Sequence, residues 1–282
     1  MTGAAPVTPG WTEAGGLKTY LLRSGTGEPV VFLHGLGASS YSWRRLLPLL
    51  APDHEVFAPD FPGYGRSDKP GRFDYTFAGF SRWLAAFLDA CGLRRAVLVG
   101  SSMGGAVALR LALDEPERVS KLVLIGAPVS LADAPRLLSI MRRPWLSRLL
   151  EPLLGRWAVR LVAPTAYLDQ ANITPDLLDE YSLALRTRAG RHAVAETMRR
   201  CISPDLPGVI RRYALLEPPV LFIRGDHDAV VGGASAADFC RAVPHGRLLR
   251  LPDCGHLPQE EKPEAVAAAL ADFLGRGPLA AG

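Results

Sequence analysis

The chain has 282 residues, of which 48% are hydrophobic and 21% charged, a composition that excludes an intrinsically disordered protein. The net charge of +4 comes without a run of lysines and arginines, so it gives no support to nucleic-acid binding. No uncharged apolar run approaches the roughly 18 residues of a membrane span, and the N-terminus carries no signal-peptide pattern. We therefore expect a soluble cytoplasmic protein. The four cysteines form no CxxC pair, which favours reduced thiols, although spacing alone leaves a disulfide open.

The first part of the chain alternates short apolar runs with amphipathic runs. Strands are predicted at residues 17–25 and 29–35, and the Ser-Gly-Thr-Gly turn between them suggests that these two strands form a hairpin. Further strands are expected at 55–60, 95–100 and 120–128, and helices at 77–92 and 103–116. Short apolar strands that alternate with helices imply a parallel sheet covered by helices on both faces.

Residues 129–217 have a different pattern, helical but broken by seven prolines and without a convincing strand. Alternation then resumes, with strands expected at 219–226 and 247–253 and helices at 234–243 and 263–275. We therefore predict an α/β core made of residues 1–128 and 218–282, and a helical lid inserted at 129–217. The lid segment holds 13 arginines, no lysine and nine acids; an arginine there could bind a substrate carboxylate, but a solvated face is the simpler interpretation.

Two adjacent serines follow the strand that ends at Gly100. Only Ser102 fits the pattern Gly-x-Ser-x-Gly, with Gly100 and Gly104 on either side, and a helical run follows it at once. A serine in such a strand-to-helix turn projects its hydroxyl from the carboxyl edge of the sheet, where the helix N-terminus favours developing negative charge. Ser102 is therefore the predicted nucleophile, and Ser101 is expected to line the pocket or support the turn.

The chain resembles the α/β-hydrolase family over about residues 17–274, interrupted by the helical block. Five segments carry the resemblance in order: VVFLHGLGASSYSW, APDFPGYGRSDKP, VGSSMGGAVALRLAL, LFIRGDHDAVV and LPDCGHLPQEEKPEAV. The resemblance implies the α/β-hydrolase fold, with about eight strands in a mostly parallel sheet, an antiparallel N-terminal hairpin and a helical lid. Its motifs are more specific for this fold than for any one substrate.

A serine hydroxyl needs a base, and the base needs an orienting acid. His256, in a loop after the last predicted strand, is the best placed of the six histidines to act as the base. The family orders its triad Ser, acid, His, which puts the acid in the RGDHD segment. The family pattern Gly-x-x-Asp favours Asp228, whereas Asp226 fits a turn-forming carboxylate. Val231 stands near where the family often has a proline.

The oxyanion hole is expected to use the backbone N–H groups of Leu36 and Met103. Seven residues are candidates for the substrate pocket: His34, Gly35, Trp43, Ser101, Trp145, Trp157 and Leu257. For the three tryptophans among them, packing against the core is the more common role. The segment HGLGASS partly matches a dinucleotide-binding fingerprint, but Ser40 replaces its third glycine. We expect no cofactor and no metal, because HExxH is absent and Cys254 and His256 make too small a ligand set.

These features predict a serine hydrolase that cleaves a small or medium apolar carboxylic ester through an acyl-enzyme. One alternative is a carbon–carbon bond hydrolase of meta-cleavage (dienone) products, whose SMGG elbow this chain shares, although Leu257 stands where those enzymes tend to have tryptophan. Dehalogenase and epoxide hydrolase chemistry needs an aspartate at the position of Ser102. An alternative of another class is a non-catalytic receptor or a repurposed cyclase. The expected partner is a small-molecule substrate, and monomer and homodimer both stay open.

Overall fold

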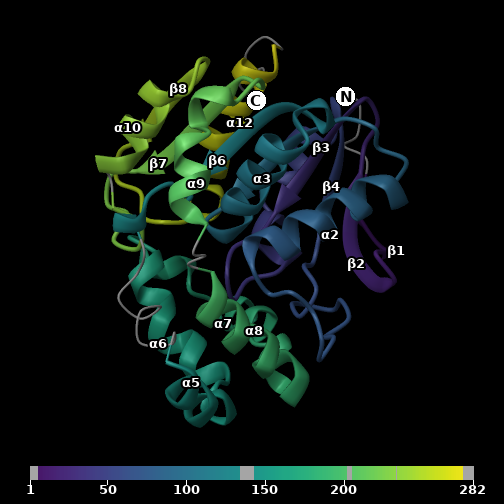
Figure 1. Cartoon of the computed structure of the whole chain (residues 1–282), viewed down its shortest axis with the longest axis vertical. Helices are drawn as coiled ribbons and strands as arrows, with labels where there is room; N and C mark the ends of the chain where they lie inside the picture. The colour runs from purple at the N-terminus through teal and green to yellow at the C-terminus, as the bar shows by residue number, and fades with distance from the viewer. Residues whose placement is uncertain (1–5, 134–142, 202–204, 233, 276–282) are drawn as a thin grey trace.

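The computed structural model describes residues 6–133, 143–201, 205–232 and 234–275. Its centre is an eight-stranded sheet in the order β1-β2-β4-β3-β5-β6-β7-β8 (Figure 1). The strands are β1 (Thr8–Ala14), β2 (Leu17–Ser24), β3 (Glu28–Leu33), β4 (His54–Pro59), β5 (Ala96–Ser101), β6 (Val119–Ile125), β7 (Val220–Gly225) and β8 (Gly246–Leu251). Every neighbouring pair from β4–β3 to β7–β8 is parallel, and β2 is antiparallel to both of its neighbours, β1 and β4. The predicted fold class is confirmed.

The N-terminal hairpin exists, but its predicted pairing is wrong. Strand β1 was not predicted from the sequence. It pairs with β2 through a turn at Gly15 and Gly16, whose φ angles are 58° and 73°. Two consecutive residues with positive φ give the turn whose twist suits a two-residue hairpin, and glycine adopts that conformation without strain. The other edge of β2 pairs with β4 rather than with β3. The Ser-Gly-Thr-Gly segment is therefore a crossing connection and not a hairpin turn.

Helices cover both faces of the sheet. One face carries α2 (Phe77–Ala90), α3 (Met103–Asp114) and α10 (Ala234–Ala242), and the other carries α1 (Leu47–Leu50) and α12 (Pro263–Leu274). The sequence of β3 is continuously apolar because the strand is buried on both sides. Val31 and Leu33 pack in the core cluster on the α2 and α3 side, whereas Val30 and Phe32 pack in the cluster on the α1 and α12 side. All of these side chains are fully buried, because successive residues of a strand point to opposite faces.

Between β6 and β7 the described residues form helices and turns, with no strand among them. The helices of this insertion are α5 (Pro144–Leu150), α6 (Arg156–Ala166), α7 (Pro175–Tyr181), α8 (Arg188–Arg200) and α9 (Leu206–Arg211). Helices α5 to α8 gather at one end of the molecule, beyond the sheet, and α9 runs back towards the core (Figure 1). In the part of the chain that the structure describes, none of the helices combines the length and apolar character needed to cross a bilayer.

Candidate active site

Ser102 occupies a strained turn between β5 and α3. Its φ of 50° and ψ of −117° are rare for a residue with a side chain, and such conformations cost about 1–3 kcal/mol. The flanking glycines make the turn possible: a Cβ at Gly104 would lie 2.2 Å from the Leu33 carbonyl oxygen, and one at Gly100 would lie 2.4 Å from that of Gly104. Backbone therefore packs against backbone on both sides of Ser102, as the Gly-x-Ser-x-Gly pattern requires.

The loop after β3 lies directly against Ser102. A Cβ built on Gly35 would be 3.3 Å from the Cβ of Ser102 and 4.0 Å from its Oγ. The Ser102 hydroxyl does not cap helix α3, so it is not held by its own backbone. Among the described residues, the N–H groups of Leu36 and Met103 donate to no protein acceptor. Two backbone donors thus lie in the residues that border this serine.

Ser101 has a different environment from its neighbour. It is fully buried, and its Oγ accepts a hydrogen bond of 3.2 Å from Nε2 of Gln259. The same amide nitrogen donates to Oγ of Ser42 at 3.1 Å. The Ser101 hydroxyl therefore joins strand β5 to helix α11 (Pro258–Glu261) inside the core.

His256 and Asp228 are joined by a hydrogen bond of 2.9 Å between Nδ1 and Oδ2, and both residues are buried. The other oxygen of Asp228 accepts the N–H groups of Val230 and Val231, each at 2.9 Å. Burial raises the pKa of Asp228, but the hydrogen bond and charge of His256, with the two N–H donors, outweigh it, so its pKa lies below the usual value. An ionised Asp228 holds the proton on Nδ1 and leaves Nε2 as the basic nitrogen.

The end of strand β6 brings Ser102 and His256 into the same neighbourhood. The Ser102 N–H donates to the Ile125 carbonyl at 2.8 Å. A Cβ on the next residue, Gly126, would lie 3.1 Å from Nδ1 and 3.2 Å from Cε1 of His256. Adjacent residues of one strand end therefore contact the serine backbone and the imidazole ring. Gly126 has a φ of 54° and leaves room for that ring.

Asp226, the alternative acid, has another partner. Its Oδ1 accepts from Nε of Arg250 at 2.7 Å, and the side chain is partly exposed. Its N–H donates to the Leu251 carbonyl, which continues the β7–β8 ladder. The structure thus brings Asp228, and not Asp226, to His256.

His34 supports the loop that carries Leu36. Its Nε2 accepts the Phe61 N–H at 3.1 Å, so Nδ1 holds the proton and donates to the Gly35 carbonyl at 2.8 Å. Complete burial lowers the pKa of His34, which favours this neutral form. Asp60 was not among the predicted site residues, but it fixes the backbone that follows this loop. Its Oδ1 accepts the Ser40 N–H at 2.6 Å, and its Oδ2 accepts the Arg66 N–H at 2.7 Å.

The remaining pocket candidates lie in three settings. Trp43 is fully buried in the core against Phe32, with ring centroids 5.2 Å apart. Leu257 is half-buried and packs against an apolar cluster of the insertion. Trp145 and Trp157 lie on α5 and α6 and are 64% and 59% exposed. The structure therefore leaves these two tryptophans in solvent and does not bury them in a pocket.

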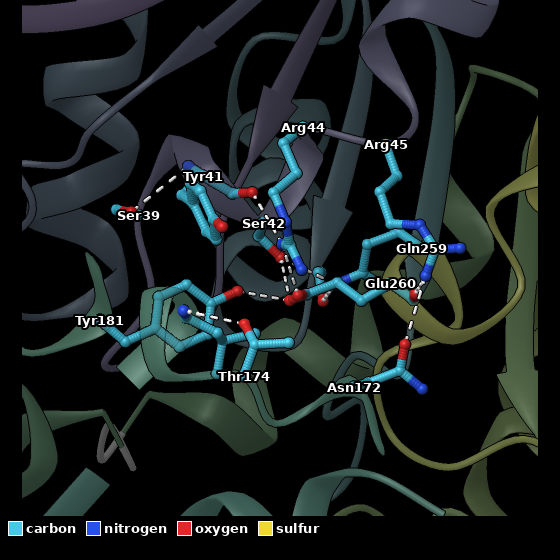
Figure 2. Close-up of polar contacts among 12 residues, drawn as sticks. Ser39, Tyr41, Ser42, Arg44, Arg45, Asn172, Thr174, Tyr181, Gln259 and Glu260 are labelled. Atoms are coloured by element: carbon cyan, nitrogen blue, oxygen red, sulfur yellow. Dashed lines mark hydrogen bonds and ion pairs between the residues drawn. The ribbon is translucent and has the colours of Figure 1, made fainter. Parts of the chain in front are cut away.

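A buried carboxylate next to the His256 loop was not predicted from the sequence. Glu260 is fully buried, and its carboxylate accepts hydrogen bonds from Ser42 Oγ and Arg44 Nη1, each at 2.8 Å, and from the Tyr181 hydroxyl (Figure 2). Burial lowers the pKa of Arg44, but Glu260 outweighs it and the pKa is raised. Burial and Glu260 raise the pKa of Tyr181, so its hydroxyl stays a donor. Glu260 thereby links the turn after the Leu36 loop to the insertion.

A second connection runs beside it. Nη1 of Arg45 donates to the Glu260 carbonyl at 2.8 Å and to Oδ1 of Asn172 at 3.2 Å (Figure 2). Arg45 follows the 3₁₀ turn η1 (Ser40–Trp43), and Asn172 lies in the 3₁₀ turn η5 (Gln170–Asn172) of the insertion. The insertion is therefore held to the core at the same end as Ser102 and His256.

The alpha/beta hydrolase fold model matches residues 28–263 of this chain. The protein belongs to this hydrolase family. Its relatives include the 2-hydroxymuconate semialdehyde hydrolase of Pseudomonas sp. (strain CF600), which is 29% identical over 95% of this chain and 94% of that one. The haloalkane dehalogenase of Mesorhizobium japonicum is 30% identical over 91% of this chain and 87% of the relative. Among solved structures, a serine hydrolase involved in carbazole degradation (CarC) is 28% identical, with a TM-score of 0.77 over 95% of this chain and 99% of that one.

Proposed function

We propose that the protein is a serine hydrolase in which Ser102 is the nucleophile, His256 the general base and Asp228 the orienting acid. The observation that carries this proposal is the buried hydrogen bond between His256 and Asp228, at the strand end that also holds the Ser102 backbone. The Ser102 hydroxyl attacks a carbonyl carbon while Nε2 of His256 takes its proton and later delivers it to the leaving alkoxide. Water then hydrolyses the acyl-enzyme.

The negative oxygen of the tetrahedral intermediate would be bound by the N–H groups of Leu36 and Met103. Each such donor is worth about 3–4 kcal/mol of transition-state stabilisation when it is well aimed. The fixed His34 ring and the Asp60 carboxylate hold the loop that presents Leu36, so this donor is positioned before substrate binds.

An apolar carboxylic ester is the substrate class that the surroundings favour. Leu257 directly follows His256 and packs against an apolar cluster of the insertion built on Ala163, Tyr167, Leu177 and Leu178. A substrate beside His256 would therefore meet mainly apolar side chains, and the insertion would act as its lid.

Carbon–carbon hydrolysis is the second candidate, favoured by the 2-hydroxymuconate semialdehyde hydrolase among the relatives. It ranks second because Leu257 stands where such enzymes tend to have tryptophan. The likeness to a haloalkane dehalogenase supports the family only, since that chemistry needs a carboxylate nucleophile and this chain has Ser102.

Turnover of p-nitrophenyl esters of rising acyl length, measured beside a dienone substrate, tests the proposed function. We expect ester hydrolysis that exceeds dienone cleavage and that disappears in Ser102→Ala. Preferential cleavage of the dienone would replace the ester assignment and keep the triad. Turnover of neither, by a protein that is folded, would support a non-catalytic role.

A further inference from the structure

The insertion exposes several large apolar side chains. Five of them recur at every fourth residue through α5, the 3₁₀ turn η4 (Glu151–Leu153) and α6: Trp145 (64% exposed), Leu149 (63%), Leu153 (55%), Trp157 (59%) and Leu161 (68%). We call these five residues the docking face. Helices α5 and α6 are neighbours at the end of the molecule opposite the C-terminal helix α12 (Figure 1). Isolated exposed apolar residues are ordinary, but five large ones on two neighbouring helices and the turn between them are not.

The docking face is separate from the side of these helices that holds the insertion together. Leu150, Leu154 and Val159 are partly buried and pack against the core. Ser147 and Ala163 are buried on the same inner side. The helices therefore have an apolar inner side that folding uses and an apolar outer side that folding does not use.

Positive charge accompanies the docking face. Residues 143–168 contain four arginines (Arg143, Arg148, Arg156 and Arg160) and one acid, Glu151. All four arginines are exposed, whereas the Glu151 side chain is 19% exposed and lies 3.4 Å from Nδ1 of His192. Of the arginines, only Arg156 has an ion-pair partner among the described residues, Asp179. The segment that carries the exposed tryptophans and leucines is thus basic, and its one acid, Glu151, lies against α8.

We propose that the docking face binds the surface of an anionic lipid bilayer without crossing it. Tryptophan and leucine side chains insert at the boundary between headgroups and acyl chains, while arginines pair with the phosphates above. A second copy of this chain fits less well, because a symmetric contact would bring the arginines of both copies together without acids to pair them. Charge complementarity therefore favours an anionic lipid surface as the occupant.

One helix of the docking face, α6, connects to the candidate active site. Helix α6 carries Trp157 and Leu161 and ends at Ala166, whose carbonyl accepts the His256 N–H at 2.8 Å. If the proposed function holds, an apolar ester that partitions into the bilayer would reach the enzyme from this side. The lipid binding itself does not depend on the proposed function, because it uses none of the three triad residues.

Sedimentation with lipid vesicles tests the proposal. The probes are vesicles of phosphatidylcholine mixed with phosphatidylglycerol, and vesicles of phosphatidylcholine alone. We expect the wild-type chain to bind the mixed vesicles more strongly, and the double variant Trp145→Ser/Trp157→Ser to lose about tenfold or more of its partition coefficient. Trp11→Ser is the matched control, since Trp11 is 51% exposed and lies on strand β1 rather than on α5 or α6, and this variant should bind as the wild type does.

Charge reversal separates the electrostatic part of the binding. Arg148→Glu/Arg160→Glu should weaken binding to the mixed vesicles about tenfold, whereas Arg247→Glu on strand β8 should not. Circular dichroism checks that each variant is folded. Equal binding by wild type and the tryptophan double variant, or no vesicle binding by the wild type, would overturn the proposal. Concentration-dependent self-association that the tryptophan double variant abolishes, without vesicle binding, would replace the lipid surface by a second copy of the chain.

Discussion

The carbonyl of Ala166, the last residue of α6, accepts the N–H of His256 at 2.8 Å, so the insertion bonds directly to the proposed general base. Glu261 reinforces this connection. Its Oε1 accepts the Gly255 N–H at 2.8 Å, and its Oε2 accepts those of Leu168 and Asp169, each at 2.9 Å. One carboxylate therefore holds both the loop before His256 and the chain that follows α6.

We expect Glu261→Ala to destabilise the protein by about 2–3 kcal/mol, because three backbone donors lose a charged acceptor. Hydrogen exchange of residues 166–170 and 255–256 should rise more than exchange of the central strands, since the loss is local. Urea unfolding gives the free energy. Glu264→Ala, an exposed acid at the start of α12, is the control and should stay within about 0.5 kcal/mol of the wild type. Unchanged exchange at both segments in Glu261→Ala would show that this carboxylate does not hold them.

Asp228→Asn should reduce kcat by about a thousand- to ten-thousand-fold while the protein stays folded. An amide still accepts the N–H groups of Val230 and Val231 through its oxygen, but its NH₂ group faces Nδ1 of His256 and favours the wrong tautomer. Steady-state kinetics on the preferred ester measures the loss. Asp226→Asn is the matched control, and an equal loss in both variants would contradict the assignment of Asp228.

The lowered pKa of Asp228 also predicts how stability depends on pH. Its folded pKa lies below the unfolded value of about 3.9, so the ionised form stabilises the fold above that pH. The contribution is lost as pH falls through the folded pKa. The difference in unfolding free energy between wild type and Asp228→Asn should therefore shrink as the pH falls below about 4. A difference that persists unchanged below that pH would contradict this account.

Gly104→Ala should be severely destabilising. Its Cβ would lie 2.2 Å from the oxygen and 2.6 Å from the carbon of the Leu33 carbonyl, and neither backbone atom can move without displacing β3. We expect a loss of about 3 kcal/mol or failure to fold, measured by thermal and urea unfolding. Gly71→Ala is the control, because nothing lies within 4 Å of its Cβ. A Gly104→Ala protein as stable as the control would mean that β3 and α3 are farther apart than described.

Removal of Glu260 should be costly because it leaves Arg44, whose side chain is 25% exposed, without its buried partner. We expect Glu260→Met to lose about 3 kcal/mol of unfolding free energy. The double variant Arg44→Met/Glu260→Met should lose clearly less than the sum of the two single variants, with a coupling of about 1–3 kcal/mol. Strict additivity of the two changes would show that Arg44 and Glu260 are not energetically coupled.

Much of the core was predictable because its signals are local. The parallel strands bury both faces and are continuously apolar, and helix α2 begins at the capping residue Thr76 and is followed by Gly92 with a φ of 71°. Strand β1 was missed because Pro9 and Gly10 are poor strand formers, and only its pairing with β2 makes it a strand. The pairing of β2 with β4 could not be predicted either, because pairing between segments far apart in the chain leaves no local sequence pattern.

The candidate site divides in the same way. Ser102, Asp228 and His256 could be proposed from short motifs and their order. Glu260 could not, because its partners Ser42 and Tyr181 lie 218 and 79 residues away in the chain. The exposure of Trp145 and Trp157 could not be predicted either, since a helical pattern with apolar residues on two sides does not say which side faces the core.

Labelling with a fluorophosphonate probe tests the central claim most directly, because the probe reacts only with an activated serine. We predict that the wild type and Ser101→Ala are labelled, that Ser102→Ala is not, and that His256→Ala is labelled far more slowly. Labelling that persists in Ser102→Ala and disappears in Ser101→Ala, or a folded wild-type protein that does not react at all, would contradict the claim that Ser102 is an activated nucleophile.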